Sequence, residues 1–195
     1  MTTEELAALL TAQTDIDFVE THLLGRRPWI FDTDKTYDEW GVAVARALLV
    51  DPISVQIVGS AATGYSLSPL KPGRPFRPSG SSVASVSDID IAVIDTDLFA
   101  VAWDTILRLD RTHRLRGSHD TRLKMRVDVY WGVIGQQSLP PGTDPARSLL
   151  RAMAVAGRAP PLRGYRVRSR LYRRHEDLRA YHVSSLRQLR AALFS

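Results

Sequence analysis

Two aspartates in a short apolar run, Asp88 and Asp90, are the residues of this chain with the clearest chemical potential. They lie in the run Ser87-Asp88-Ile89-Asp90-Ile91-Ala92-Val93. Side chains alternate along a strand, so both carboxylates are expected on one face. Two adjacent carboxylates repel unless a cation joins them, and hard oxygen ligands suit Mg²⁺ or Mn²⁺. The pattern indicates a metal site. The alternative is one exposed Asp at a strand start and one Asp hydrogen-bonded in a turn.

A third aspartate, Asp128, lies in a segment rich in Val, Tyr and Trp that predicts a strand over residues 125–133. A buried carboxylate without a partner is energetically costly. If this strand lies beside the strand of Asp88 and Asp90, Asp128 completes a cluster of three carboxylates around two metal ions, which offsets that cost.

A Gly-Ser pair precedes these aspartates. The β-branched run over residues 53–58 predicts a strand, and it ends in Gly59-Ser60 where a helix starts. Glycine allows a phosphate to approach the backbone closely, and helix N-terminal amides together with the Ser60 hydroxyl form an anion site. We therefore expect phosphate binding at Gly59 and Ser60.

The elements that must position these residues are a mixture of helices and strands. Apolar periodicity predicts helices over residues 4–12, 15–24, 37–50, 97–109 and 144–156, and strands over 53–58, 88–94 and 125–133. The expected fold class is α+β, with a small mixed sheet backed by helices.

Residues 67–87 show neither period. Prolines fall at positions 69, 72, 75 and 78, and this spacing matches the three residues per turn of polyproline II. Lys71, Arg74 and Arg77 share the same spacing and would form a basic ridge along an extended segment. The alternative is a solvated loop whose basic residues contact nothing.

The positive charge of the chain is concentrated at its end. The formal net charge is +5, and residues 158–195 contain ten of the 26 basic residues but only two of the 21 acidic ones, so this segment carries +8 and the remainder −3. An apolar stripe predicts one long amphipathic helix there, formed by Leu171, Leu178, Tyr181, Leu186, Leu189 and Leu193. We expect the stripe to pack on the rest of the chain, while the arginines either bind RNA phosphates or simply face solvent.

Composition excludes several classes of protein. The chain of 195 residues has no cysteine, so disulfide frameworks and thiolate chemistry are excluded. Its first residues lack a secretory or transit pattern, and no stretch approaches the ~20 apolar residues of a membrane helix. The sequence predicts a cytoplasmic protein without a membrane partner.

The order of these motifs resembles that of the DNA polymerase β-like nucleotidyltransferase superfamily, as a small stand-alone member. The resemblance covers residues 53–133, with 37–50 as the helix before the first strand. It implies a palm-like mixed sheet that binds an NTP and two Mg²⁺ or Mn²⁺ ions. Asp88, Asp90 and Asp128 would hold the metals, Asp128 would also draw the proton from the attacking hydroxyl, and Gly59 and Ser60 would hold the β and γ phosphates.

One departure from that family concerns spacing. Its small members commonly have about a dozen residues between the Gly-Ser and the first Asp, whereas Ser60 and Asp88 are 28 positions apart here. The excess is the proline-rich segment 67–87, which must then emerge beside the nucleotide. Lys71 is thereby a candidate phosphate ligand.

The resulting hypothesis is a nucleotidyltransferase domain over residues 1–157, with core motifs in 37–133, followed by an Arg-rich helical segment over 158–195. It would transfer a nucleoside monophosphate from an NTP to a hydroxyl of an RNA end, a protein or a small molecule, and release pyrophosphate. Two alternatives stay open: a non-catalytic module of the same fold that binds a nucleotide or partner, as in an antitoxin, and a basic RNA-binding protein.

Overall fold

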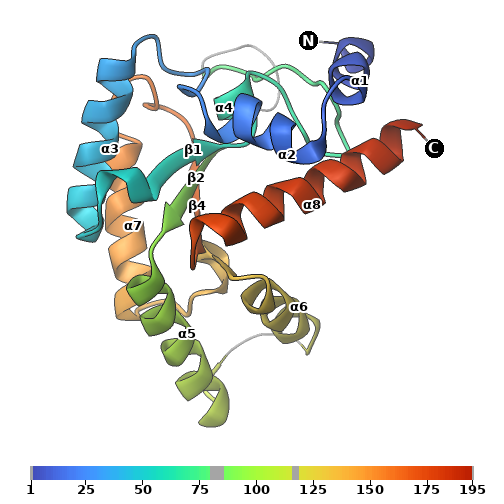
Figure 1. Cartoon of the computed structure of the whole chain (residues 1–195). Helices are drawn as coiled ribbons and strands as arrows, with labels where there is room; N and C mark the ends of the chain where they lie inside the picture. The colour runs from blue at the N-terminus through green and yellow to red at the C-terminus, as the bar shows by residue number, and fades with distance from the viewer. Residues whose placement is uncertain (1, 80–85, 116–118, 195) are drawn as a thin grey trace.

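A four-stranded mixed sheet forms the centre of the computed structural model, which describes residues 2–79, 86–115 and 119–194 (Figure 1). The strand order is β1 (Val55–Val58), β2 (Ile89–Ile94), β4 (Val167–Tyr172) and β3 (Val133–Gly135). β1 is antiparallel to β2, β2 is parallel to β4, and β3 is antiparallel to β4. The expected α+β class with a small mixed sheet is confirmed.

Helices cover both faces of this sheet. α8 (His175–Phe194) crosses one face, and α3 (Asp34–Leu48) and α7 (Asp144–Ala156) pack together on the other (Figure 1). The remaining helices of four or more residues are α1 (Thr3–Thr11), α2 (Asp15–Phe18), the π-helical turn η1 (Val19–Leu24), α4 (Ser60–Thr63), α5 (Thr96–Arg111) and α6 (His119–Tyr130). Within the described ranges, no helix combines the length and the apolar character needed to cross a membrane.

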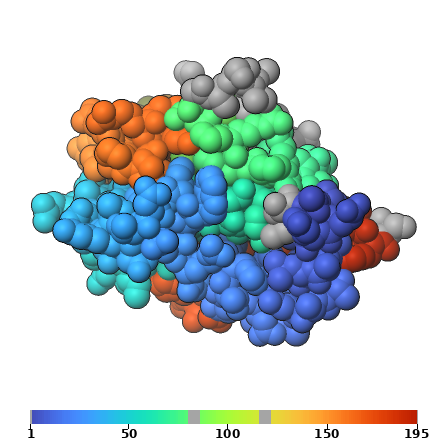
Figure 2. All heavy atoms as spheres, turned by 90° about the horizontal axis from the view of Figure 1, so that it is seen from above, coloured from blue at the N-terminus to red at the C-terminus, as the bar shows by residue number. Residues whose placement is uncertain are grey.

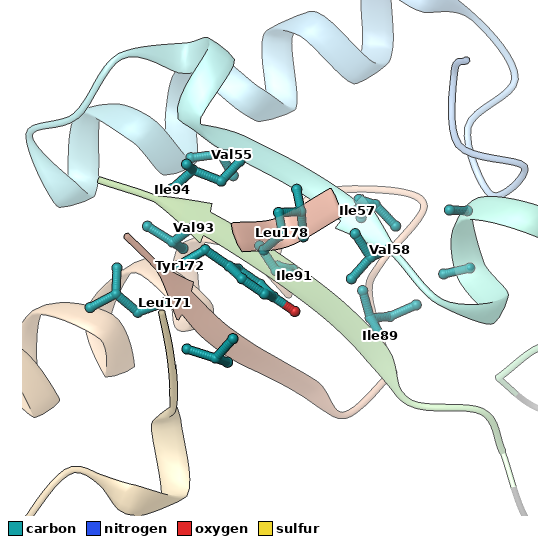
Figure 3. Packing of buried hydrophobic residues seen from close by; sticks show 14 of the residues in the cluster. Val55, Ile57, Val58, Ile89, Ile91, Val93, Ile94, Leu171, Tyr172 and Leu178 are labelled. Atoms are coloured by element: carbon teal, nitrogen blue, oxygen red, sulfur yellow. The ribbon is translucent and has the colours of Figure 1, made fainter. Parts of the chain in front are cut away.

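The core is built on the central strands. Ile89, Ile91 and Val93 of β2 are fully buried, and Leu171 of β4 and Leu178 of α8 are buried with them (Figure 3). Burying a side chain of this size contributes about 1.5–3 kcal/mol relative to leaving it exposed. The alternation predicted for residues 88–94 places Ile89, Ile91 and Val93 on one face of β2 and Asp90 on the other, where Ala92 and Ile94 are also buried.

The C-terminal segment is not one long helix, so that prediction was wrong. Leu171 belongs to β4, and α8 begins only at His175. In Val167–Tyr172 the side chains alternate between buried Ser169 and Leu171 and the more exposed Arg168 and Arg170. This period of two is that of a strand, and the segment pairs with β2. Strand pairing and burial here outweigh the high helix propensity of arginine.

The predicted strand over residues 125–133 is also wrong. Most of it lies in α6, and only Val133–Gly135 forms a strand, β3. Met125 is buried and Val129 packs against the core one turn later, a helical spacing. Val127 and Tyr130, which contributed to the strand prediction, are exposed.

α8, the helix of the C-terminal segment, packs on the N-terminal helices through both its apolar and its charged side chains. Leu178, Leu186 and Leu189 are buried, which confirms the expected packing of the stripe. Other α8 side chains form ion pairs with the N-terminal segment, namely Arg179 with Glu20, and Arg187 (3.4 Å) and Arg190 with Asp15. Part of the basic surface expected to bind RNA is therefore used within the chain.

The imidazole of His182, on α8, is buried in the folded chain. The His182 Nε2 atom is buried without a hydrogen-bond partner in the described structure, and its ring lies 5.4 Å from that of Tyr181. Burial, helped by the charge of Arg170, lowers the His182 pKa from 6.5 to about 3. The folded chain thus holds His182 neutral, and its contribution to stability is complete above pH 6.5 and is lost as the pH falls towards about 3.

We therefore expect acid to destabilise the protein partly through His182. The free energy of unfolding, measured with urea, should fall in the wild type when the pH is lowered from 7.5 to 5. In His182→Phe this fall should be smaller by about 2 kcal/mol. His113→Asn, at an exposed position, is the control and should follow the wild type. An identical pH dependence in His182→Phe would contradict the buried neutral imidazole.

Candidate functional site

A polar cleft of about 360 Å³ lies at the end of the sheet where β1 ends and β2 and β4 begin. It combines two carboxylates, four basic side chains and three hydroxyls, and is lined by Ser60, Ser66, Lys71, Arg74, Pro75, Val86, Ser87, Asp88, Asp90, Arg168 and Arg170. Four of the residues predicted from the sequence therefore lie together: Ser60, Lys71, Asp88 and Asp90. The cleft can bind both a cation and an extended anion.

The fifth predicted residue, Gly59, does not line the cleft itself but directly precedes Ser60 and lies beside Asp90. Val58 pairs with Asp90 across the antiparallel strands, and the chain then turns at Gly59 with φ of +67° into α4. A Cβ atom on Gly59 would lie 3.3 Å from the Asp90 Oδ2 atom. Position 59 favours glycine for two reasons: the backbone has a positive φ, and the Asp90 carboxylate lies close to where a Cβ atom would be.

The two carboxylates differ in environment. Asp88 forms an ion pair of 2.8 Å with Arg168, in which the two side chains keep 33% and 50% of their exposure. Asp90 is more buried, and this burial raises its pKa, an effect opposed by Arg170, Arg168 and Lys71 and reinforced by Asp88. Asp88 is therefore the more accessible carboxylate, and the nearby basic side chains favour the charged form of Asp90.

Arg168 and Arg170 were not predicted as site residues. Both lie on β4, and Arg168 pairs in register with Asp90. The Arg170 guanidinium lies 5.5 Å from the centre of the Tyr181 ring of α8, a cation–π contact. The signal in the sequence was the alternation of Arg168 and Arg170 with apolar or small residues, which the expectation of a continuous helix concealed.

Lys71 and Arg74 reach the cleft from a compact loop. The Ser66 amide donates to the Arg74 carbonyl oxygen (2.8 Å), and the Gly73 amide donates to that of Ser66 (3.0 Å). Polyproline II has no such internal hydrogen bonds, so the predicted extended ridge is wrong. Arg77, the third residue of that ridge, does not line the cleft.

Aromatic contacts anchor this loop to the body. Phe76 is buried, with ring centroids 5.6 Å from Trp29 and 5.5 Å from Tyr165. Figure 2 shows the green loop beside the dark blue helix α1, and the Thr3 hydroxyl donates to the Pro72 carbonyl oxygen (3.3 Å). This loop thus presents Lys71 to the cleft from an anchored position.

Asp128 does not join the other carboxylates. It lies on α6 outside the cleft lining, and burial raises its pKa while the charges of Lys124 and Arg170 oppose that rise. Among the described residues, no group of three His, Asp or Glu side chains is close enough to share a metal ion. The strand beside Asp90 carries Arg168 and Arg170 instead of the expected third carboxylate.

Comparisons with protein-family models, with curated proteins and with solved structures give no match to this chain. What the cleft can do therefore follows from its own residues.

The close contact at Gly59 can be tested by substitution. Gly59→Ala should lower the free energy of unfolding by more than Gly142→Ala, because both glycines have positive φ (+67° and +81°) but only Gly59 faces another group. Gly59 also has ψ of −151°, a combination essentially confined to glycine, so its alanine variant carries a backbone cost of about 1–3 kcal/mol besides the contact. Chemical denaturation measures the difference, and equal losses would show that the Gly59 turn does not press against Asp90.

Proposed function

We propose that this protein is a metal-dependent nucleotidyltransferase, which transfers a nucleoside monophosphate from an NTP to a hydroxyl acceptor and releases pyrophosphate. One observation carries the proposal: Ser60 after the Gly59 turn, the Asp88 and Asp90 carboxylates and Lys71 all line one cleft. Groups for an anion and groups for a divalent cation thus lie side by side, which is what a metal-bound triphosphate requires.

The carboxylates fit a single Mg²⁺ ion that enters with the triphosphate. Mg²⁺ is commonly held by one or two carboxylates together with substrate phosphates and water, and Asp88 and Asp90 provide two. The Asp88–Arg168 pair is partly exposed, and such pairs contribute about 0–1 kcal/mol, so releasing Asp88 costs little. The second ion stays a prediction, and so does the role of Asp128 in holding it. Among the described residues, no third carboxylate lines the cleft.

The remaining side chains divide between the phosphates. Ser60, Lys71 and Arg74 line the cleft on the side of the β1 turn and the loop, where they would bind the β and γ phosphates. Arg168 and Arg170, on β4, lie beside the carboxylates. They would bind the α phosphate by charge-assisted hydrogen bonds and stabilise the negative charge that develops on it during transfer. A bound Mg²⁺ would supply Lewis acidity to the phosphate oxygens.

A second function, a non-catalytic nucleotide-binding module, is favoured by the same β4 arginines. With four basic residues against two carboxylates, the cleft can bind a phosphorylated ligand without transferring it. The third alternative, RNA binding through the Arg-rich tail, is less favoured because Arg179, Arg187 and Arg190 pair with acidic residues of the chain.

The test is incubation of the protein with Mg²⁺, each of the four NTPs labelled at the α phosphate, and RNA or protein acceptors. Transfer predicts label on an acceptor together with pyrophosphate release. Mg²⁺-dependent NTP binding without pyrophosphate release would establish the non-catalytic module instead.

Asp88→Asn and Asp90→Asn should each lower transfer by about 100-fold or more, because each removes a charged metal ligand. Asp104→Asn, an exposed aspartate on α5, is the matched control and should keep the wild-type rate. Thermal unfolding of all three verifies that they fold. Undiminished transfer by the Asp88→Asn, Asp90→Asn double variant would refute the assignment.

A further inference from the structure

A second cavity of about 620 Å³ adjoins the cleft and shares one residue with it, Arg168. It lies where β3 ends and β4 begins, against α7. Its walls combine apolar side chains with amide and guanidinium groups, among them Gln137, Leu139, Leu150, Arg166 and Val167. The size lies within the range of about 300–1,000 Å³ that is usual for small-ligand sites.

The strand order places the second cavity beyond Arg168 as seen from the cleft, on the side of the sheet that α7 covers. Along this end of the sheet come the Gly59–Ser60 turn after β1, then Asp90 at the start of β2, Arg168 on β4, and Gln136 after β3. The amide and hydroxyl of Ser169 both donate to Gln136 Oε1 (3.1 and 3.0 Å), which holds Gln136 beside β4. Two strand spacings, about 10 Å, separate β2 from β3.

Phosphoryl transfer places the attacking and leaving oxygens on opposite sides of phosphorus. In the proposed function, on which this inference rests, pyrophosphate leaves towards Ser60, Lys71 and Arg74. The attacking hydroxyl must then arrive from the opposite side, which is the side of Arg168 and the second cavity. A new bond forms between that oxygen and the α phosphorus, the bond to the β-phosphate bridging oxygen breaks, pyrophosphate leaves with the electron pair, and the hydroxyl proton passes to solvent.

The lining indicates the class of acceptor. Two arginines, Arg166 and Arg168, line the cavity and no acidic residue does so within the described part of the chain, so a polycationic acceptor is disfavoured and an anionic one is favoured. Leu150 and the partly exposed Val167 offer apolar surface to a flat ring, and the Gln137 amide can hydrogen-bond a base edge.

We infer that the second cavity binds the nucleotide that carries the acceptor hydroxyl, either at the end of an RNA or as a free mononucleotide. Arg166 would hold its phosphate, and the apolar wall would hold its base. This assigns acceptor binding to the region between β4 and α7 and not to the C-terminal helix.

Leu150 permits a direct test because it is 55% exposed on α7. Leu150→Glu introduces a carboxylate into the cavity without disturbing the core. Leu123→Glu is the matched control, since Leu123 is 52% exposed on α6 and outside both cavities. Binding is measured by fluorescence anisotropy of a labelled oligoribonucleotide, by displacement of that RNA with AMP, and separately with a fluorescent ATP analogue and Mg²⁺.

Leu150→Glu should weaken RNA or AMP binding by about tenfold or more, through charge repulsion and lost apolar contact, and should leave ATP-analogue binding unchanged. Displacement by AMP at concentrations near its cellular level identifies a mononucleotide acceptor, and displacement only by oligoribonucleotides identifies an RNA end. Equal RNA and AMP binding by Leu150→Glu and Leu123→Glu would overturn the inference.

The two proposals fail separately. If the wild type transfers label to RNA and Leu150→Glu does so equally well, the acceptor site is wrong and the transferase stands. If no NTP is turned over but Leu150→Glu still weakens oligonucleotide binding, the cavity binds a nucleotide and the transferase proposal is wrong.

Discussion

β2 and β4 pair in parallel along Ile89–Ile94 and Val167–Tyr172, and both the core and the candidate site depend on this contact. It places Arg168 beside Asp90, residues that are 78 positions apart in the chain. It also carries β3 on the far side of β4 and directs the following chain into α8, whose Leu178 is buried with β2 (Figure 3). Without this pairing, the carboxylates would have no cationic neighbours on β4, and the second cavity would lose the Arg168 wall that it shares with the cleft.

The charged form of Asp90 is energetically unfavourable in the cleft, and the neighbouring basic groups offset this only partly. Burial opposes the charged form of Asp90, and the nearby Asp88 adds to that effect, so a neutral residue at position 90 would suit the fold better at neutral pH. The basic groups Arg168, Arg170 and Lys71 reduce the cost, and a bound cation would reduce it further. Strained electrostatics of this kind are typical of functional sites, where stability is sacrificed for ligand binding.

The distribution of charge has a structural cause. The segment 158–195 carries +8, yet its helix packs Arg179, Arg187 and Arg190 against Glu20 and Asp15. Three of the ten arginines of this segment therefore take part in attraction within the chain. The arginines that precede this helix, Arg168 and Arg170 on β4, instead line the cleft, so the position of a basic residue in the fold, and not the net charge, determines which of them can meet a phosphate.

Local order determined one half of the site. The period of two around Asp88 and Asp90, and the Gly59-Ser60 pair after an apolar strand, are short-range patterns in which neighbouring residues dictate the backbone, and the structure places them in one cleft. Tertiary structure decided the other half. Residues 125–130 are β-prone in sequence but form part of α6. Residues 167–172 contain three strong helix formers, Arg168, Arg170 and Leu171, but pair as β4. In both segments long-range burial and strand pairing outweigh local propensities of less than about 1 kcal/mol per residue. The position of Asp128 outside the cleft lining and the alignment of Arg168 with Asp90 both depend on long-range contacts, although the alternation around Arg168 and Arg170 is visible in the sequence.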